Sequence, residues 1–160
     1  MLKRTITPTP PPSASPAGDW LDLETLAEVE ITSEDGVHPI ESALLPGRGS
    51  GWRAGHPGEQ TIRIVFAKPQ RLRRICLQFS ERQVERTQMY VLHWSPESGG
   101  AGHEVVRQQW NFSPTGASVE TEEHHVDLAA VARLELTITP DISDNAGATA
   151  IASLNYLRLA

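Results

Sequence analysis

The 160-residue sequence contains one cysteine, Cys76, so no disulfide can form within it. It has no apolar run close to the roughly 18 residues that a membrane-spanning helix requires. Lys and Arg number 14 against 20 Asp and Glu, and the net charge of -6 argues against general nucleic-acid binding, which needs a basic surface. The basic start, Met1 to Thr5, is not followed by the apolar segment of a signal peptide, and we therefore expect a cytoplasmic protein.

Motifs that carry catalysis are missing as well. The sequence has no phosphate-binding Walker loop and no Gly-x-Gly-x-x-Gly segment. The segment 48–52 comes close to a nucleophile elbow, but Arg48 and Trp52 stand where that motif needs glycine. Cys76 lies inside an apolar strand pattern, where a thiol is usually inert. We predict a protein that is not an enzyme, with no catalytic residues.

Proline is concentrated at the start of the chain. Residues 5–18 hold five prolines and one isoleucine, which leaves few backbone donors and little apolar surface to bury. We predict that residues 1–18 form a disordered leader and that one domain spans residues 19–160. A polyproline ligand for a partner protein is the alternative interpretation of the leader.

Beyond the leader, the dominant pattern is the alternation of apolar and polar residues. This period of two predicts strands with one buried face at 61–66, 74–79 and 133–139. Their buried faces supply the predicted core: Ile62, Ile64, Phe66, Ile75, Leu77, Phe79, Leu134, Leu136 and Ile138.

Five more strands are expected at 27–32, 88–94, 104–112, 119–127 and 150–159. Turn residues separate these segments, and a helical turn at 127–131 is expected to lead into the strand after it. No long amphipathic helix is present. The fold class is therefore predicted as all-β, an antiparallel β-sandwich or jelly roll of about eight strands.

The order of these elements resembles the galactose-binding-like jelly roll, the discoidin or coagulation-factor type C family. The likeness covers about 130 residues, from Val29 to Leu159, and rests on five segments: 51–66, 69–77, 89–100, 132–136 and 152–159. In segment 89–100, Glu97-Ser98 replaces the family's acidic-Gly hairpin tip. The resemblance implies a binding module that holds carbohydrate, phospholipid head groups or protein through loops at one end of the barrel.

The sequence departs from the family at two places. Secreted members often carry a disulfide, for which Cys76 has no partner. Some carbohydrate-binding members hold calcium through an acidic residue in the last strand, where this chain has Asn155.

Two segments offer side chains suited to a sugar. In the first, Trp52 and Arg53 lie in a Gly-rich loop close to His56, and an indole stacks on a sugar face while a guanidinium donates a fork of hydrogen bonds. In the second, Trp110 and Asn111 place an indole beside an amide. The alternatives are that Trp52 plugs the mouth of the barrel and that Trp110 faces the core. His38 is added as a further hydrogen-bonding residue.

A metal site has weaker support. The adjacent His124 and His125 point to opposite faces of a strand, and nothing completes a set around His93 and His103. Acidic turns at 33–36 and 141–145 offer oxygen ligands for calcium but lack EF-hand spacing. We predict no metal ligands and no cofactor, with calcium in these loops as an alternative.

The function predicted from sequence is a non-catalytic binding module. Carbohydrate binding through Trp52, Arg53, His38, His56, Trp110 and Asn111 is the first hypothesis. An intracellular protein-interaction or scaffolding domain that uses the same loops or a sheet face is the second. An exposed Trp ringed by polar groups would indicate the first, and an apolar patch of several hundred square ångströms the second. Neither hypothesis includes nucleic acid or membrane insertion, and the oligomeric state is left open.

Overall fold

The computed structural model describes residues 19–97, 99, 102–143 and 149–160. The leader predicted at 1–18 therefore lies outside the described residues. Strands predominate and every strand pairing is antiparallel, which confirms the predicted fold class. In chain order the elements are α1 (Leu23–Leu26), β1 (Ala27–Ile31), α2 (Glu41–Leu44), β2 (Trp52–Arg53), β3 (Gln60–Ser80), β4 (Arg86–Ser95), β5 (His103–Phe112), β6 (Val119–Thr139), β7 (Ser153–Leu154) and β8 (Tyr156–Leu159).

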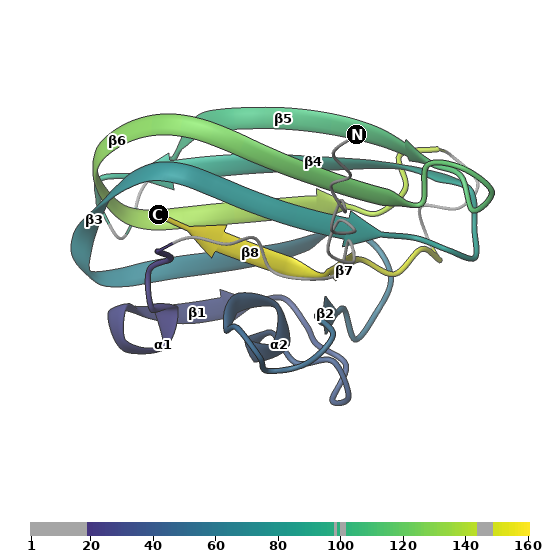
Figure 1. The fold of residues 1–160 in the computed structure, drawn as a ribbon, viewed down its shortest axis with the longest axis horizontal. Helices are drawn as coiled ribbons and strands as arrows, with labels where there is room; N and C mark the ends of the chain where they lie inside the picture. Colours follow the sequence, from purple (N-terminus) through teal and green to yellow (C-terminus); the bar gives the residue numbers. More distant parts are fainter. Residues whose placement is uncertain (1–18, 98, 100–101, 144–148) are drawn as a thin grey trace, which may run out of the picture.

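Two strands of 21 residues, β3 and β6, organise the sandwich. They pair with each other along most of their length, and both curve through a bend at the left of Figure 1. Before its bend β3 pairs with β1, and after it with β8. Register shifts between Val65 and Arg74 mark the bend, as expected where extra residues let a strand curve. The strand order β1-β3-β6-β4-β5, with β8 beside β3, thus closes into two layers.

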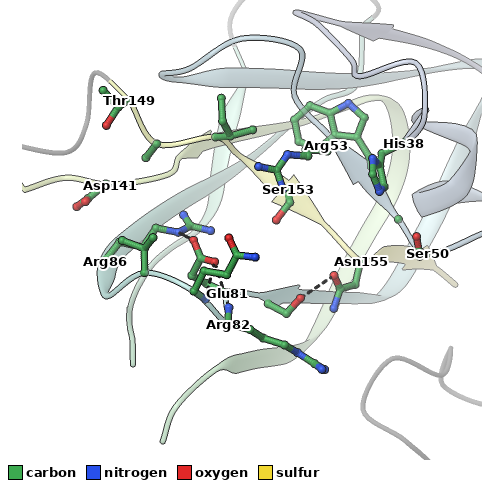
Figure 2. A pocket seen from close by; sticks show the side chains of 17 residues that line it. His38, Ser50, Arg53, Glu81, Arg82, Arg86, Asp141, Thr149, Ser153 and Asn155 are labelled. Atoms are coloured by element: carbon green, nitrogen blue, oxygen red, sulfur yellow. Dashed lines mark hydrogen bonds and ion pairs between the residues drawn. The ribbon is translucent and has the colours of Figure 1, made fainter. Parts of the chain in front are cut away.

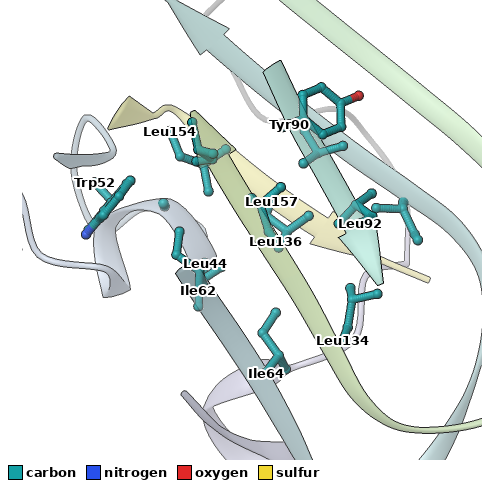
Figure 3. Packing of buried hydrophobic residues seen from close by; sticks show 14 of the residues in the cluster. Leu44, Trp52, Ile62, Ile64, Tyr90, Leu92, Leu134, Leu136, Leu154 and Leu157 are labelled. Atoms are coloured by element: carbon teal, nitrogen blue, oxygen red, sulfur yellow. The ribbon is translucent and has the colours of Figure 1, made fainter. Parts of the chain in front are cut away.

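The core lies between these layers, and all nine predicted core residues are buried in it. Ile62 and Ile64 come from the first half of β3, whereas Ile75, Leu77 and Phe79 come from the second half, yet all belong to one cluster. Figure 3 shows how side chains from β3, β4, β6 and β8 meet there.

The predicted helical turn at 127–131 is wrong. These residues belong to β6, where Leu128 pairs with Leu72 and Val131 pairs with Gln70 across the bend. The helix propensity of residues Leu128 to Ala130 does not decide the local structure, because this part of β6 pairs with β3.

The predicted strand at 150–159 is divided into β7 and β8 by Asn155. A small second sheet pairs β7 with β2, with Trp52 opposite Leu154 and Arg53 opposite Ser153. This pairing joins the Gly-rich loop to the C-terminal segment. No helix in the described part of the chain has the length and apolarity that a membrane span needs.

Candidate functional site

A polar cleft of about 410 Å³ opens at the end of the sandwich where β2, β7 and the β3–β4 loop meet. Its lining comes from five separate parts of the sequence: residue 38, residues 50–53, residues 80–84 with 86, residue 141, and residues 149–151 with 153 and 155. We call it the Arg53 cleft. In the view of Figure 2, Arg53 and Ser153 lie above, Glu81, Arg82 and Arg86 lie below and to the left, and Asn155 lies at the right.

Trp52 borders this cleft, but its side chain is only 1% exposed. The indole packs in the hydrophobic core with Leu154 (Figure 3), and its Nε1 donates a hydrogen bond to the Ser33 carbonyl oxygen at 3.1 Å. A stacking platform must present an open ring face, so the prediction that Trp52 stacks on a sugar is wrong. Trp52 instead closes the end of the barrel, the alternative stated for it above.

Arg53 points the other way along β2 and is exposed. The backbone N–H of Arg53 donates to the His38 carbonyl oxygen at 3.1 Å, and its own carbonyl accepts from the Asp35 N–H at 2.8 Å. These bonds fix His38 beside Arg53 at the cleft. His38 Nδ1 lies 3.4 Å from Asp35 Oδ2, and a backbone hydrogen bond from Val37 together with His38 lowers the pKa of Asp35.

The remaining predicted site residues lie elsewhere. His56 is exposed in the loop after β2, with Nδ1 3.3 Å from Gln60 Nε2, and it does not line the cleft. Trp110 and Asn111 are on β5, where they border a separate shallow depression with Gln109 and Ala117. The six predicted residues therefore do not form one site: His38, Trp52 and Arg53 come together, whereas His56, Trp110 and Asn111 do not join them.

The β3–β4 loop contributes residues that the sequence analysis missed. Arg86 is 5% exposed, and its Nε donates to Glu81 Oε1 at 2.9 Å, while Nη1 donates to the Pro140 carbonyl. Glu81 Oε2 in turn accepts from the N–H of Arg82 at 3.1 Å. Arg86 thus links Glu81 in the β3–β4 loop to Pro140, which follows β6. The carboxylate of Glu81 balances the positive charge of Arg86.

Asp141 and Asn155 complete the wall. Asp141 Oδ1 accepts from the Ser143 N–H at 2.9 Å and its hydroxyl at 2.6 Å. Burial opposes ionisation of this carboxyl, but these hydrogen bonds prevail and lower its pKa. Asn155 Nδ2 donates to Gln78 Oε1 at 3.0 Å, and its Oδ1 accepts from Ser80 Oγ at 3.1 Å. The side-chain amide of Asn155 is therefore held in one orientation where it lines the cleft.

Gly51 shows why the loop before β2 is rich in glycine. Its φ of +112° is a left-handed conformation that favours glycine, and a Cβ there would lie 2.6 Å from the Leu154 carbonyl oxygen. Only glycine lets the loop approach β7 this closely and deliver Arg53 to the cleft.

The acidic residues considered for calcium are engaged separately. Glu34 accepts from the N–H of Ile40, whereas Asp35 lies against His38. Within the described residues, no group of three or more His, Cys, Asp or Glu side chains is arranged to hold a metal ion.

No protein-family model matches the sequence, and no curated protein matches it. Solved structures do match its shape. The CBM32 domain of AlyQ in complex with 4,5-unsaturated mannuronic acid superposes with a TM-score of 0.60 and 12% identity, covering 84% of this chain and 95% of that one. The chain has the galactose-binding-like fold.

Two other neighbours with this fold come from Clostridium perfringens. CBM32-3 from a family 31 glycoside hydrolase gives a TM-score of 0.63 at 17% identity, covering 88% of this chain and 93% of its own. The family 32 module of NanJ in complex with galactose gives 0.55 at 18%, covering 83% and 92%. These neighbours are carbohydrate-binding modules, and the predicted resemblance to the galactose-binding-like fold is confirmed.

Proposed function

We propose that the protein is a non-catalytic carbohydrate-binding module and that its ligand occupies the Arg53 cleft. The observation that carries this proposal is that several hydrogen-bonding side chains line one cleft: Arg53, Arg82, Ser153 and Asn155. A polyol is bound by such fixed donors and acceptors, and a cleft of about 410 Å³ lies in the size range of small-ligand sites. The carbohydrate-binding modules that share the fold support the same ligand class.

Three of the four residues have backbones or side chains that the fold holds in place. Arg53 is on β2, and Ser153 pairs with it from β7. Asn155 is held by Gln78 and Ser80. Since the backbone of Arg53 and Ser153 and the amide of Asn155 are fixed in this way, less conformational entropy is lost when a sugar hydrogen-bonds to these residues.

The protein-interaction alternative gains no support from the surface. It predicts a contiguous apolar patch, but the large hydrophobic residues exposed in the described part of the chain are only Val37, Val84 and Ile142.

The test is thermal unfolding with a panel of neutral and acidic saccharides, on the wild type, Arg53→Ala and a control. Arg107→Ala is the matched control, since Arg107 is also an exposed strand arginine but lies on β5, where it pairs with Glu104. A saccharide that binds the folded state raises Tm saturably. We expect that rise in the wild type and in Arg107→Ala, and its loss in Arg53→Ala. An undiminished rise in Arg53→Ala would place the site elsewhere.

A further inference from the structure

A second cleft adjoins the Arg53 cleft. This neighbour, of about 450 Å³, is lined by residues of α2, the Gly-rich loop and β8, including Ser42, Gly49, Tyr156 and Arg158. We call it the Arg158 cleft. Four residues line both clefts: Ser50, Ser80, Arg82 and Asn155. The two clefts therefore adjoin each other, with Arg82 and Asn155 at the junction, and we call them together the groove.

Positive charge gathers along this groove, although the chain as a whole carries a net charge of -6. Its lining contains four arginines and two carboxylates: Arg53, Arg82, Arg86 and Arg158 against Glu81 and Asp141. Both carboxylates line the Arg53 cleft, and none of the residues that line the Arg158 cleft is Asp or Glu.

The arginines of the groove are not equally available. Arg86 is paired with Glu81, and Arg158 is 4% exposed and donates to the carbonyls of Ala43 and Leu157. Arg53 and Arg82 are exposed, and within the described residues neither makes a side-chain ion pair. Six other arginines do pair with carboxylates. The two exposed guanidinium groups at the groove are thus left to face a ligand.

We propose that the ligand is an anionic oligosaccharide that runs from the Arg53 cleft past Arg82 into the Arg158 cleft. This inference rests on the proposed function and specifies its ligand. A planar guanidinium donates two parallel hydrogen bonds to a carboxylate or sulfate, so Arg82 recognises an acidic group at the junction. The two adjoining clefts, of about 410 and 450 Å³, are each in the size range of a small-ligand site, which favours a chain of sugars over a single residue.

The test measures binding by calorimetry with tetramannuronate and tetragalacturonate, with their carboxyl-reduced neutral forms, with a sulfated mannotetraose and with the monosaccharides. The proteins are the wild type, Arg82→Ala, Arg82→Lys and the control Arg107→Ala, each checked for an unchanged melting temperature. Because Arg82 is exposed, its replacement leaves the core untouched.

We expect the wild type to bind at least one acidic tetramer about tenfold more tightly than its neutral form, since a hydrogen bond between charged groups contributes that much. We expect Arg82→Ala to lose about tenfold for that tetramer, Arg82→Lys to recover part of the loss, and Arg107→Ala to lose nothing. Affinity should fall as salt is raised. Comparison of the uronate tetramers with the sulfated tetramer shows whether the recognised anionic group is a carboxylate or a sulfate.

Equal binding of acidic and neutral tetramers, or an undiminished affinity in Arg82→Ala, would overturn the anionic ligand and leave carbohydrate binding in place. A monosaccharide that binds as tightly as its tetramer would overturn a ligand that runs through both clefts. Failure of every saccharide to bind would overturn the proposed function itself.

Discussion

The buried carboxyl of Glu120 gives a sharp test of the core. Glu120 is 1% exposed on β6, its Oε1 lies 3.5 Å from Gln88 Nε2, and its Oε2 has no hydrogen-bond partner in the described structure. Burial, and then the nearby Glu122, raise the pKa of Glu120 from an ordinary 4.5 to about 7. Folding therefore takes up a proton between these two pH values.

The direction in which the stability changes with pH follows from the difference in proton binding between the folded and unfolded states. Where the folded state binds more protons than the unfolded state, the free energy of unfolding falls as pH rises. A difference of about 2.5 pKa units corresponds to roughly 3 kcal/mol, lost between pH 4.5 and 7 and not regained above pH 7. Glu120→Gln keeps the shape of the protonated side chain without its titration. The variant should match the wild type near pH 4 and exceed it by about 3 kcal/mol at pH 8.

Urea denaturation of both proteins at several pH values measures this difference. Other groups, including His124, whose pKa is lowered by burial, titrate in both proteins and cancel in the comparison. Glu28→Gln is the control for removing one carboxylate, because Glu28 is exposed on β1. Parallel pH profiles for Glu120→Gln and the wild type would refute a buried, neutral Glu120.

Three further predictions concern the framework of the groove. Trp52→Ala should cost about 3–5 kcal/mol in urea denaturation because a buried indole is removed, and a change below 1 kcal/mol would contradict its place in the core. Gly51→Ala should destabilise by about 2 kcal/mol or more, whereas Gly47→Ala, also at positive φ but with open space around it, should cost only about 1 kcal/mol. Similar melting temperatures for the two glycine variants would argue against the close approach to β7. Leu136→Asp should abolish cooperative unfolding, since it buries an unpaired charge, and a soluble, cooperative variant would show that β6 is out of phase.

The core could be predicted because alternation reports burial residue by residue. Leu134, Leu136 and Ile138 are buried as their pattern requires. The course of β3 and β6 could not be predicted, since the bend depends on pairing between residues far apart in sequence, such as Gln70 with Val131. The helices α1 and α2 are four residues long, too short for a helical period to show.

Only some of the residues that line the cleft could be recognised from the sequence. Arg53 stood out because a glycine-rich loop delivers it, whereas Arg82 lies in a polar turn that looks like any solvated loop. Trp110 was chosen for its chemistry, and chemistry alone does not say where on the fold a residue lies. Asp141 and Asn155 reach the cleft through pairings that no local pattern records. Trp52 was misjudged because a tryptophan beside an arginine suits a binding site and a core boundary equally well.

The most direct test of carbohydrate binding in the Arg53 cleft is an amide chemical-shift titration of the ¹⁵N-labelled protein with the saccharides named above. We expect the chemical shifts of the backbone amides of Arg53, Arg82, Ser153 and Asn155 to move together and saturably with one of these saccharides. Shifts confined to Gln109–Asn111 on β5, or no shift with any saccharide, would contradict this expectation.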